Sequence, residues 1–390
     1  MPGLFQREPG FMLKVFLFAV STLLLAFTLS CNQHSSGKAK DESEAYLVGI
    51  NLTLSGNAAY YGSEVYKGLE LAFKDAEKKY ECRFTLFTED NRFMPQEAVG
   101  ITKKFLHVTK PHLIISGYTN LLQTIIPLVE AAGMPMIATL SSSVDLAREK
   151  QWVIRDFALE SQLMPLLADY IFSQKGLRKG SFLVVNDDFG HDSRDYFKHT
   201  FESLGGSFES GAVFNEDELD LRTLVGKIMS TNPEFVLVIG RGAGMANVIR
   251  QIRELNPEVV ICGSNSFDNQ KIMESLGAAA EGLIYVNFSK TGLNTDYFEI
   301  SQRFIEKHQY RMNWVNMVGY SLGEYAAQSL VASSGEPKAL LSYLRQENFS
   351  TIRGQLKVNQ SNDMLSDISV YVRENNQSNE IPKSNQTLTN

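Results

Sequence analysis

Short apolar runs alternate with amphipathic segments over most of this chain of 390 residues. Each run is apolar at nearly every position, which is typical of strands that are buried on both faces of a parallel sheet. The segments between them repeat apolar residues at intervals of three and four, which indicates helices. The alternation predicts an α/β fold with helices on both faces of parallel sheets. The predicted strands are 45–52, 83–88, 113–116, 135–138, 153–156, 181–186, 207–214, 235–239, 259–262, 282–286, 354–358 and 368–372.

The chain beyond residue 44 exceeds the usual size of one domain, so we expect two lobes. After residue 289 the pattern becomes mainly helical. The polar tail 373–390 has no apolar periodicity and is predicted to be disordered. The predicted helices are 63–80, 95–109, 161–174, 192–204, 221–231, 245–255, 297–309, 313–333 and 337–347.

Residues 1–31 have the layout of a secretory signal peptide, because Arg7 and Lys14 precede an apolar run, 15–27, that is too short to span a membrane. The run leads to Thr28-Leu-Ser-Cys31, which resembles the lipobox of bacterial lipoproteins, although Leu29 stands where a small residue is usual. An uncleaved anchor and an ordinary signal peptide are the alternatives. We predict an exported protein, periplasmic or at the cell surface, that is anchored in the membrane by lipid on Cys31. Residues 32–44 would form a polar tether.

The net charge of −7 argues against a nucleic-acid partner. Removal of residues 1–31 takes away two positive charges and one negative charge, so the mature chain would carry −8. The two Cys beyond the signal peptide, Cys82 and Cys262, lack the spacing of a metal site, and a disulfide between them has no support in the sequence. We expect no metal and no cofactor.

Several segments resemble the amino-acid-type periplasmic binding proteins, of which the leucine/isoleucine/valine-binding proteins are the best known. Val48-Gly-Ile-Asn-Leu-Thr-Leu-Ser-Gly-Asn-Ala-Ala-Tyr-Tyr-Gly62, followed by Gly68-Leu-Glu-Leu-Ala-Phe, matches the first strand, ligand loop and helix of that family. Further matches follow in order at 182–190, 235–251 and 354–363, so the resemblance covers 46–372. It implies two Rossmann-like lobes with parallel sheets joined by a three-crossing hinge, the type I periplasmic binding fold. Lobe one would contain 45–158 plus 289–334, and lobe two 159–288 plus 335–372.

The resemblance also implies a ligand site on two loops of lobe one. Ligands of parallel sheets lie beyond the strand ends, where helix N-termini offer backbone N–H groups to an anion. Gly117-Tyr-Thr-Asn120 leads into one predicted helix, and Thr139-Leu-Ser-Ser-Ser143 leads into another, with Ser142 and Asp145 spaced as a capping box. Helix capping is the alternative role for these hydroxyl groups. The positions that match the carboxylate-binding residues of the family are Thr119, Leu140, Ser141 and Ser142.

Four more positions correspond to ligand-binding positions of the family. Tyr61 and Phe189 match aromatic residues that cover the ligand, with ordinary packing between the lobes as the alternative. Asn265 stands where an acidic residue would bind the ligand ammonium, and Arg241 stands where a Tyr would assist it. Because a buried ammonium without a carboxylate is costly, Arg241 favours a ligand with an added carboxylate, phosphate or other acceptor over a simple α-amino acid. An exposed loop arginine is the alternative.

One motif favours an enzyme. Gly319-Tyr-Ser-Leu-Gly-Glu fits G-x-S-x-G and resembles malonyl-type acyltransferases, in which the Ser, here Ser321, is the nucleophile. In those folds the catalytic His follows the Ser, whereas all six His of this chain precede it. The apolar residues around Ser321 also repeat at helical spacing. We therefore predict no catalytic residue.

Two further motifs are weak. Gly240-Arg-Gly-Ala-Gly244 has Met245 where a dinucleotide fingerprint needs glycine. Asp187, Asp188, His191 and Asp192 crowd one turn without the spacing of a metal loop.

The sequence therefore predicts a binding lipoprotein that closes two lobes around a small polar solute, such as an amino acid, an amide or a carboxylate-bearing compound, and delivers it to an ABC-type permease. A ligand-sensing subunit that contacts a membrane receptor would have the same sequence features. A serine acyltransferase or hydrolase that uses Ser321 is the distant alternative.

Overall fold

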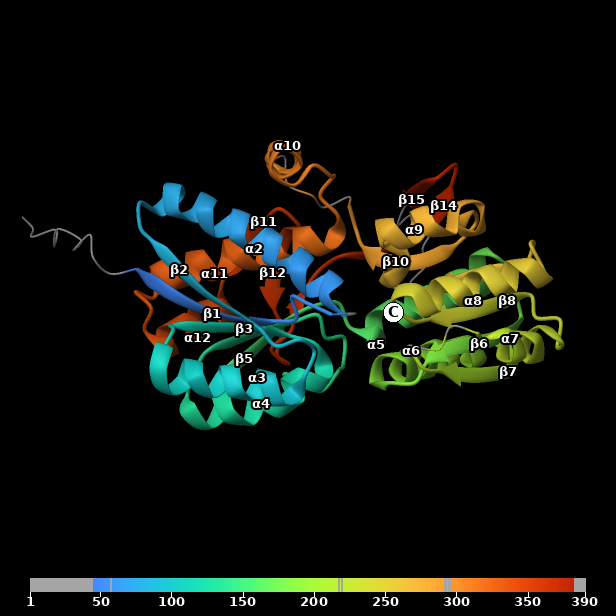
Figure 1. Cartoon of the computed structure of the whole chain (residues 1–390), viewed down its shortest axis with the longest axis horizontal. Helices are drawn as coiled ribbons and strands as arrows, with labels where there is room; N and C mark the ends of the chain where they lie inside the picture. The colour runs from blue at the N-terminus through green and yellow to red at the C-terminus, as the bar shows by residue number, and fades with distance from the viewer. Residues whose placement is uncertain are drawn as a thin grey trace, which may run out of the picture. The chain divides into compact units, whose positions relative to one another are not determined.

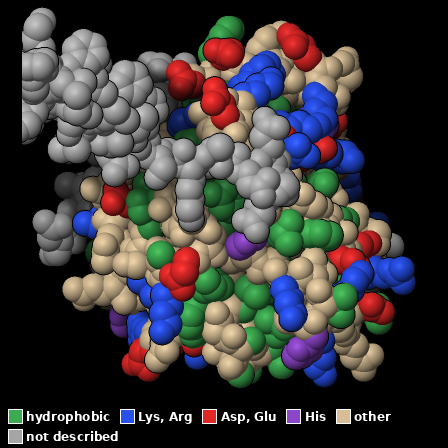
Figure 2. All heavy atoms as spheres, turned by 90° about the vertical axis from the view of Figure 1, so that its left-hand side faces the viewer, with side chains coloured by type: hydrophobic (Ala, Val, Ile, Leu, Met, Phe, Trp, Pro, Cys, Tyr) green, Lys and Arg blue, Asp and Glu red, His purple; other side chains and the backbone are tan. Residues whose placement is uncertain are grey.

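The computed structural model describes residues 45–381, except 57, 217, 219, 291–292 and 294–295. The predicted signal peptide, the lipidation site Cys31 and the tether lie outside the described residues. None of the described helices is long and apolar enough to cross a membrane. On the visible part of the face drawn in Figure 2, basic and acidic side chains are intermixed, and no continuous basic surface is seen there.

The first sheet is parallel throughout. It consists of β1 (Tyr46–Leu52), β2 (Phe84–Asp90), β3 (Leu113–Gly117), β4 (Met136–Thr139) and β5 (Val153–Asp156) in the order β2-β1-β3-β4-β5. Helices α2 (Ala59–Tyr80) and α11 (Trp314–Ala332) lie on one face, and α3 (Pro95–Lys104) and α4 (Thr119–Ala132) lie on the other (Figure 1). Because β1 pairs with both β2 and β3, the connections diverge beyond β1 and β3, and a crevice opens at their carboxyl ends.

The second sheet adds two antiparallel strands to a parallel core. Its strands are β6 (Lys179–Val185), β7 (Ser207–Phe214), β8 (Phe235–Ile239), β9 (Val260–Gly263), β10 (Ile284–Phe288), β14 (Ile368–Glu374) and β15 (Gln377–Glu380), in the order β15-β14-β10-β9-β8-β6-β7. The connections diverge beyond β6 and β8, which repeats the arrangement of the first sheet.

Alternate residues of β8 pack against opposite helix layers, as the period of two in a strand requires. Phe235 contacts rings of α6 (Asp188–Ser203), on the side that also carries α5 (Glu160–Asp169). Val236 and Val238 belong to the hydrophobic cluster beneath α7 (Arg222–Met229), α8 (Gly242–Leu255) and α9 (Gln270–Leu276). The predicted α/β fold class with two parallel-sheet lobes is thus confirmed, and the strands and helices expected from the sequence are present with shifted ends.

The C-terminal segments correct the predicted lobe boundary. Helix α10 (Tyr297–His308) precedes α11, and α12 (Pro337–Gln346) packs against α11. Strands β11 (Asn348–Thr351), β12 (Gly354–Val358) and β13 (Met364–Leu365) form a small antiparallel sheet, and β13 contacts β5. Residues 337–365 therefore lie against lobe one instead of lobe two, because their apolar residues are buried on that side, as Phe349 is against Tyr325.

The predicted disordered tail is also corrected over residues 373–381. β14 continues to Glu374, and β15 pairs with it antiparallel. The Glu380 carboxylate accepts hydrogen bonds from the Ser289 hydroxyl at 2.6 Å and from the Lys290 backbone N–H at 2.9 Å. Residues 382–390 lie outside the described residues.

Three segments connect the lobes: 157–159 after β5, 289–296 after β10, and 366–367 before β14. Two buried ion pairs lie where the first segment leaves β5. Arg155 Nη2 is 2.5 Å from Asp363 Oδ1, and Arg353 Nη2 is 2.6 Å from Asp156 Oδ2. These pairs attach the small sheet to the end of β5.

The G-x-S-x-G motif lies inside α11, where its glycines allow close helix packing. A Cβ on Gly319 would lie 2.1 Å from the carbonyl oxygen of Val65 in α2, and a Cβ on Gly68 would lie 2.1 Å from that of Asn316. Ser321 is fully buried, and its hydroxyl has no hydrogen-bond partner among the described residues. Ser321 lies seven residues into α11, and the element directly before α11 in the described part is helix α10, so no strand leads into a nucleophile elbow at Ser321.

Replacement of Gly319 by Ala should force α2 and α11 apart and lower the free energy of unfolding by about 3 kcal/mol, because overpacking a close contact is destabilising. Urea denaturation would measure this loss. The control is Gly100→Ala in α3, where a Cβ meets nothing within 4 Å, and which should stabilise the protein by about 0.5–1 kcal/mol. Wild-type stability of Gly319→Ala would refute the packing explanation of the motif.

Candidate functional site

A cavity of about 450 Å³ lies where the carboxyl ends of the two sheets face each other. This volume is typical of sites for small molecules. Thr119 follows β3, Leu140 follows β4, Arg241 follows β8 and Asn265 follows β9, and all four line the cavity. The cavity thus occupies the position at which open α/β sheets bind ligands.

The structure brings seven of the eight predicted ligand-binding residues to this cavity. They are Tyr61, Thr119, Leu140, Ser142, Phe189, Arg241 and Asn265. Ser141 is buried beside the wall, and its hydroxyl oxygen lies 2.8 Å from that of Thr119. The structure thus places these residues around one cavity, and their role in binding a ligand stays a prediction.

The wall from lobe one contains strained backbone at two strand ends. Tyr118 has φ 70° and ψ 127°, and Leu140 has φ 51°. A positive φ at a bulky residue costs about 1–3 kcal/mol and is concentrated at functional sites. Tyr118 precedes α4, which begins at Thr119 without a side-chain cap. The α4 N-terminus therefore presents backbone N–H groups and a partial positive charge at the cavity, an arrangement suited to an anion.

The helix predicted after Ser143 is absent, because residues 144–149 form turns. Ser142 and Asp145 therefore form no capping box, and Asp145 instead pairs with Arg148 at 3.0 Å. The Ser142 carbonyl accepts a hydrogen bond from the Glu160 backbone N–H at 3.3 Å. Of the two predicted lobe-one loops, only the one at Thr119 leads directly into a helix, α4.

On the wall from lobe two, Arg241 is held in a fixed orientation. Its Nη1 lies 2.7 Å from Asp187 Oδ2, and its guanidinium lies over the Phe189 ring, 4.3 Å from the centroid. Burial lowers the pKa of Arg241, but the carboxylates of Asp187 and Glu216 more than offset this effect, so the pKa is raised. The sequence does not predict that Asp187 and Glu216 are the carboxylates near Arg241. Asp187 belongs to the weak metal motif, and Glu216 lies in a loop that has no recognisable pattern.

Aromatic rings that the sequence did not single out complete the cavity. Phe157 lies in the first connection between the lobes, and its ring centroid is 6.0 Å from that of Trp314 at the start of α11. Phe93 and Tyr118 also line the cavity, with their rings 5.0 Å apart. No local pattern distinguishes these rings from core residues. The buried Tyr61 hydroxyl faces Ser266 and Asn269 of lobe two and makes no well-formed hydrogen bond to a described residue.

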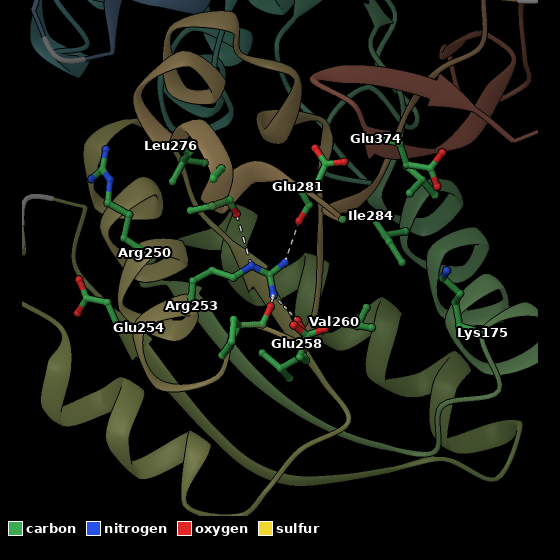
Figure 3. A pocket seen from close by; sticks show the side chains of 16 residues that line it. Lys175, Arg250, Arg253, Glu254, Glu258, Val260, Leu276, Glu281, Ile284 and Glu374 are labelled. Atoms are coloured by element: carbon green, nitrogen blue, oxygen red, sulfur yellow. Dashed lines mark hydrogen bonds between the residues drawn. The ribbon is translucent and has the colours of Figure 1, made fainter.

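A larger cavity, about 830 Å³, lies elsewhere in lobe two, beside the starts of β9 and β10 (Figure 3). Arg253 projects into it and donates hydrogen bonds to the backbone carbonyl oxygens of Pro257 at 2.9 Å, Val259 at 2.5 Å and Glu281 at 3.1 Å. Burial lowers the pKa of Arg253, and Glu258 raises it, with burial dominant. Because its donors are engaged by carbonyls, Arg253 connects loops and is not available to a ligand.

Arg253→Met should therefore lower the free energy of unfolding by about 2 kcal/mol, because the carbonyl of the buried Val259 loses its donor and the loops at Pro257 and Glu281 lose their connection. Chemical denaturation would measure the change. Arg250→Met is the matched control in the same cavity, since Arg250 bonds mainly to exposed groups of Ser275. Equal stability of the two variants would contradict the structural role of Arg253.

The described residues contain no group of three His, Cys, Asp or Glu side chains placed to hold a metal ion. In the weak metal motif, Asp187 pairs with Arg241, and His191 Nε2 lies 3.2 Å from Asn186 Oδ1.

Comparison with known proteins supports the architecture. Residues 46–372 match the family model of the periplasmic binding proteins. The Leu/Ile/Val-binding protein of Escherichia coli strain K12 is 23% identical over 340 residues, which cover 83% of this chain and 89% of that protein. The corresponding protein of Citrobacter freundii is 24% identical over 359 residues, which cover 87% and 93%.

Solved structures of binding proteins have the same fold as this chain. A leucine binding protein from Thermotoga maritima superposes with a TM-score of 0.80 at 19% identity, covering 87% of this chain and 98% of that chain. A solute binding protein of an ABC transporter from R. palustris, in complex with benzoate, gives 0.78 at 18% identity, covering 87% and 96%. The chain therefore belongs to the periplasmic binding protein family and has its type I fold.

Proposed function

We propose that this protein captures a small carboxylate-bearing solute between its lobes and delivers it to an ABC-type importer. The observation that carries the proposal is the uncapped N-terminus of α4, preceded by strained Tyr118, opposite the fixed guanidinium of Arg241. The α4 N-terminus would bind the solute carboxylate with the Thr119 and Ser142 hydroxyls. Export and lipid anchoring through Cys31 are part of the proposal and rest on the signal-peptide layout.

The second wall favours a solute with a hydrogen-bond acceptor at its far end. Arg241 presents a planar guanidinium, and Asn265 takes the place of an acidic residue. The rings of Phe93, Phe157 and Trp314 suit an apolar or flat body. The named ligands of the relatives span this range, from leucine, isoleucine and valine to benzoate and 4-hydroxybenzoate. An amino acid or another carboxylate lies within the proposed class.

A thermal-shift screen should identify the solute. The panel would contain amino acids, monocarboxylates, dicarboxylates, benzoates, amides and nucleosides. A true ligand at a hundred times its Kd stabilises the protein by about 2.7 kcal/mol, which gives a clear rise in Tm. Response to carboxylates with a second acceptor is expected. Tight binding of leucine alone would contradict the role given to Arg241 and Asn265, and no response to any carboxylate would contradict the proposed solute class.

Arg241→Ala should weaken binding of the strongest carboxylate in that screen roughly 30-fold, because a charged hydrogen bond is lost. Isothermal titration calorimetry would measure Kd. The control is Arg250→Ala, in the same helix but at the other cavity, and its Kd should equal that of the wild type. Unchanged affinity of Arg241→Ala would mean that Arg241 does not contact the solute.

A further inference from the structure

Glu160 is a buried carboxyl group at the contact between the lobes. It is the first residue of α5, directly after the first connecting segment, and it is only 1% exposed. Its Oε2 accepts a hydrogen bond from the Ser193 hydroxyl of α6 at 2.9 Å. The Glu160 backbone N–H donates to the carbonyl oxygen of Ser142, on the cavity wall of lobe one, at 3.3 Å, which places the Ser142 side chain beside this carboxylate. Glu160 thus joins a helix of lobe two to a loop that lines the solute cavity.

The surroundings of Glu160 do not neutralise its charge. None of the described basic residues forms an ion pair with it. Asp192, on α6, adds a like charge, while Arg241, at the start of α8, attracts it from a longer distance. The pKa of Asp192 is itself raised by the nearby carboxylates of Asp188 and Asp145 and lowered by His191. Burial raises the pKa of Glu160 to about 7, against the smaller opposing effects of the Ser193 and Ser142 hydroxyls.

We propose that Glu160 is a positioning residue that orients the Ser142 hydroxyl and couples closure of the lobes to uptake of one proton. The proposal rests on the proposed function, because it assumes that the lobes close over the cavity. When the lobes separate, water reaches Glu160 and the carboxylate is ionised at neutral pH. Closure places the Ser142 loop against it and excludes water, so the carboxylate takes a proton from solvent to become the neutral acid.

The protonation state of Glu160 also decides what Ser142 offers to the cavity. An ionised Glu160 can only accept, so it holds the Ser142 proton and leaves an oxygen lone pair toward the solute. A protonated Glu160 donates its own O–H to a neighbouring hydroxyl oxygen, which frees the Ser142 proton for a solute acceptor. With Glu160 protonated, Ser142 can therefore donate a hydrogen bond to an anionic solute. With Glu160 ionised, Ser142 can instead accept a hydrogen bond from an N–H or O–H group of the solute.

The sign of the pH dependence follows from the raised pKa in the closed form. The contribution of Glu160 to the free energy of closure is fully present below the ordinary pKa of Glu. This contribution is lost as the pH rises through about 7. Small-angle X-ray scattering of the protein without solute would measure the radius of gyration between about pH 5.5 and pH 8. We expect a more compact protein at the lower pH, with the ratio of closed to open forms changed on the order of tenfold.

Glu160→Gln, which is neutral at every pH, should remove this dependence and keep the protein compact. Ser193→Ala removes one hydroxyl that stabilises the charge, so it should move the midpoint to higher pH, and it serves as a second test if Glu160→Gln folds poorly. Glu324→Gln is the matched control: burial also raises the pKa of Glu324 to about 7, but Glu324 accepts the Ile352 N–H within lobe one, so its variant should titrate like the wild type.

His191→Gln is the second control and should also retain the pH dependence. A wild-type radius that does not change with pH, or a pH dependence that persists in Glu160→Gln, would overturn the proposal. Because the scattering measurement uses no solute, these outcomes are distinct from a failure of the proposed function, which the solute screen and Arg241→Ala decide.

Discussion

The arrangement of the lobes depends on two consecutive charged residues at the end of β5. Successive side chains of a strand point to opposite faces, so Arg155 and Asp156 reach different partners, Asp363 and Arg353. All four are buried. A buried ion pair adds little stability over apolar residues, but the loss of one partner costs about 3–5 kcal/mol. The pairs therefore specify which segments are held to lobe one, and they place the start of the hinge directly after Asp156.

Arg353 extends this constraint to the other connections between the lobes. Its Nη1 donates to the Ser366 hydroxyl in the third connection at 3.1 Å, and its guanidinium lies 5.4 Å from the ring of Phe288, which precedes the second. Phe288 in turn contacts Phe157 and Trp314, both of which line the cavity. Of these two cavity residues, Phe157 belongs to the first connection itself. Packed rings thus join the cavity wall to the first and second connections.

Elements with a local sequence pattern could be predicted, whereas contacts between distant segments could not. Strands and crossover helices were found because apolar periodicity is a local signal. The placement of 337–365 against lobe one was missed because an amphipathic segment does not reveal which surface its apolar face covers. β15 is polar in sequence and is held by backbone pairing at a sheet edge, which leaves no side-chain pattern.

Two short motifs have the spacing of a functional or capping motif, but the structure around them gives each segment another role. Ser142 and Asp145 have the spacing of a capping box, but the nine residues between Ser143 and Val153 form turns and bends. The glycines around Ser321 have the spacing of a nucleophile elbow, but α2 requires them for close approach. At the cavity, the strand-end positions were predictable from the family resemblance, whereas Phe157, Trp314 and Glu216 depend on tertiary proximity.

Hydrogen bonds within the protein fix the orientation of groups on both walls of the cavity. Asp187 caps α6 and accepts the Gly190 N–H at 2.9 Å, so the carboxylate that orients Arg241 is fixed by the helix itself. Tyr118 is held in its strained conformation by a hydrogen bond from its hydroxyl to the Ala58 carbonyl at 2.5 Å. Preorganised donors lose little conformational freedom on binding. The role proposed for Glu160 therefore concerns closure of the lobes and not the orientation of the groups on either wall.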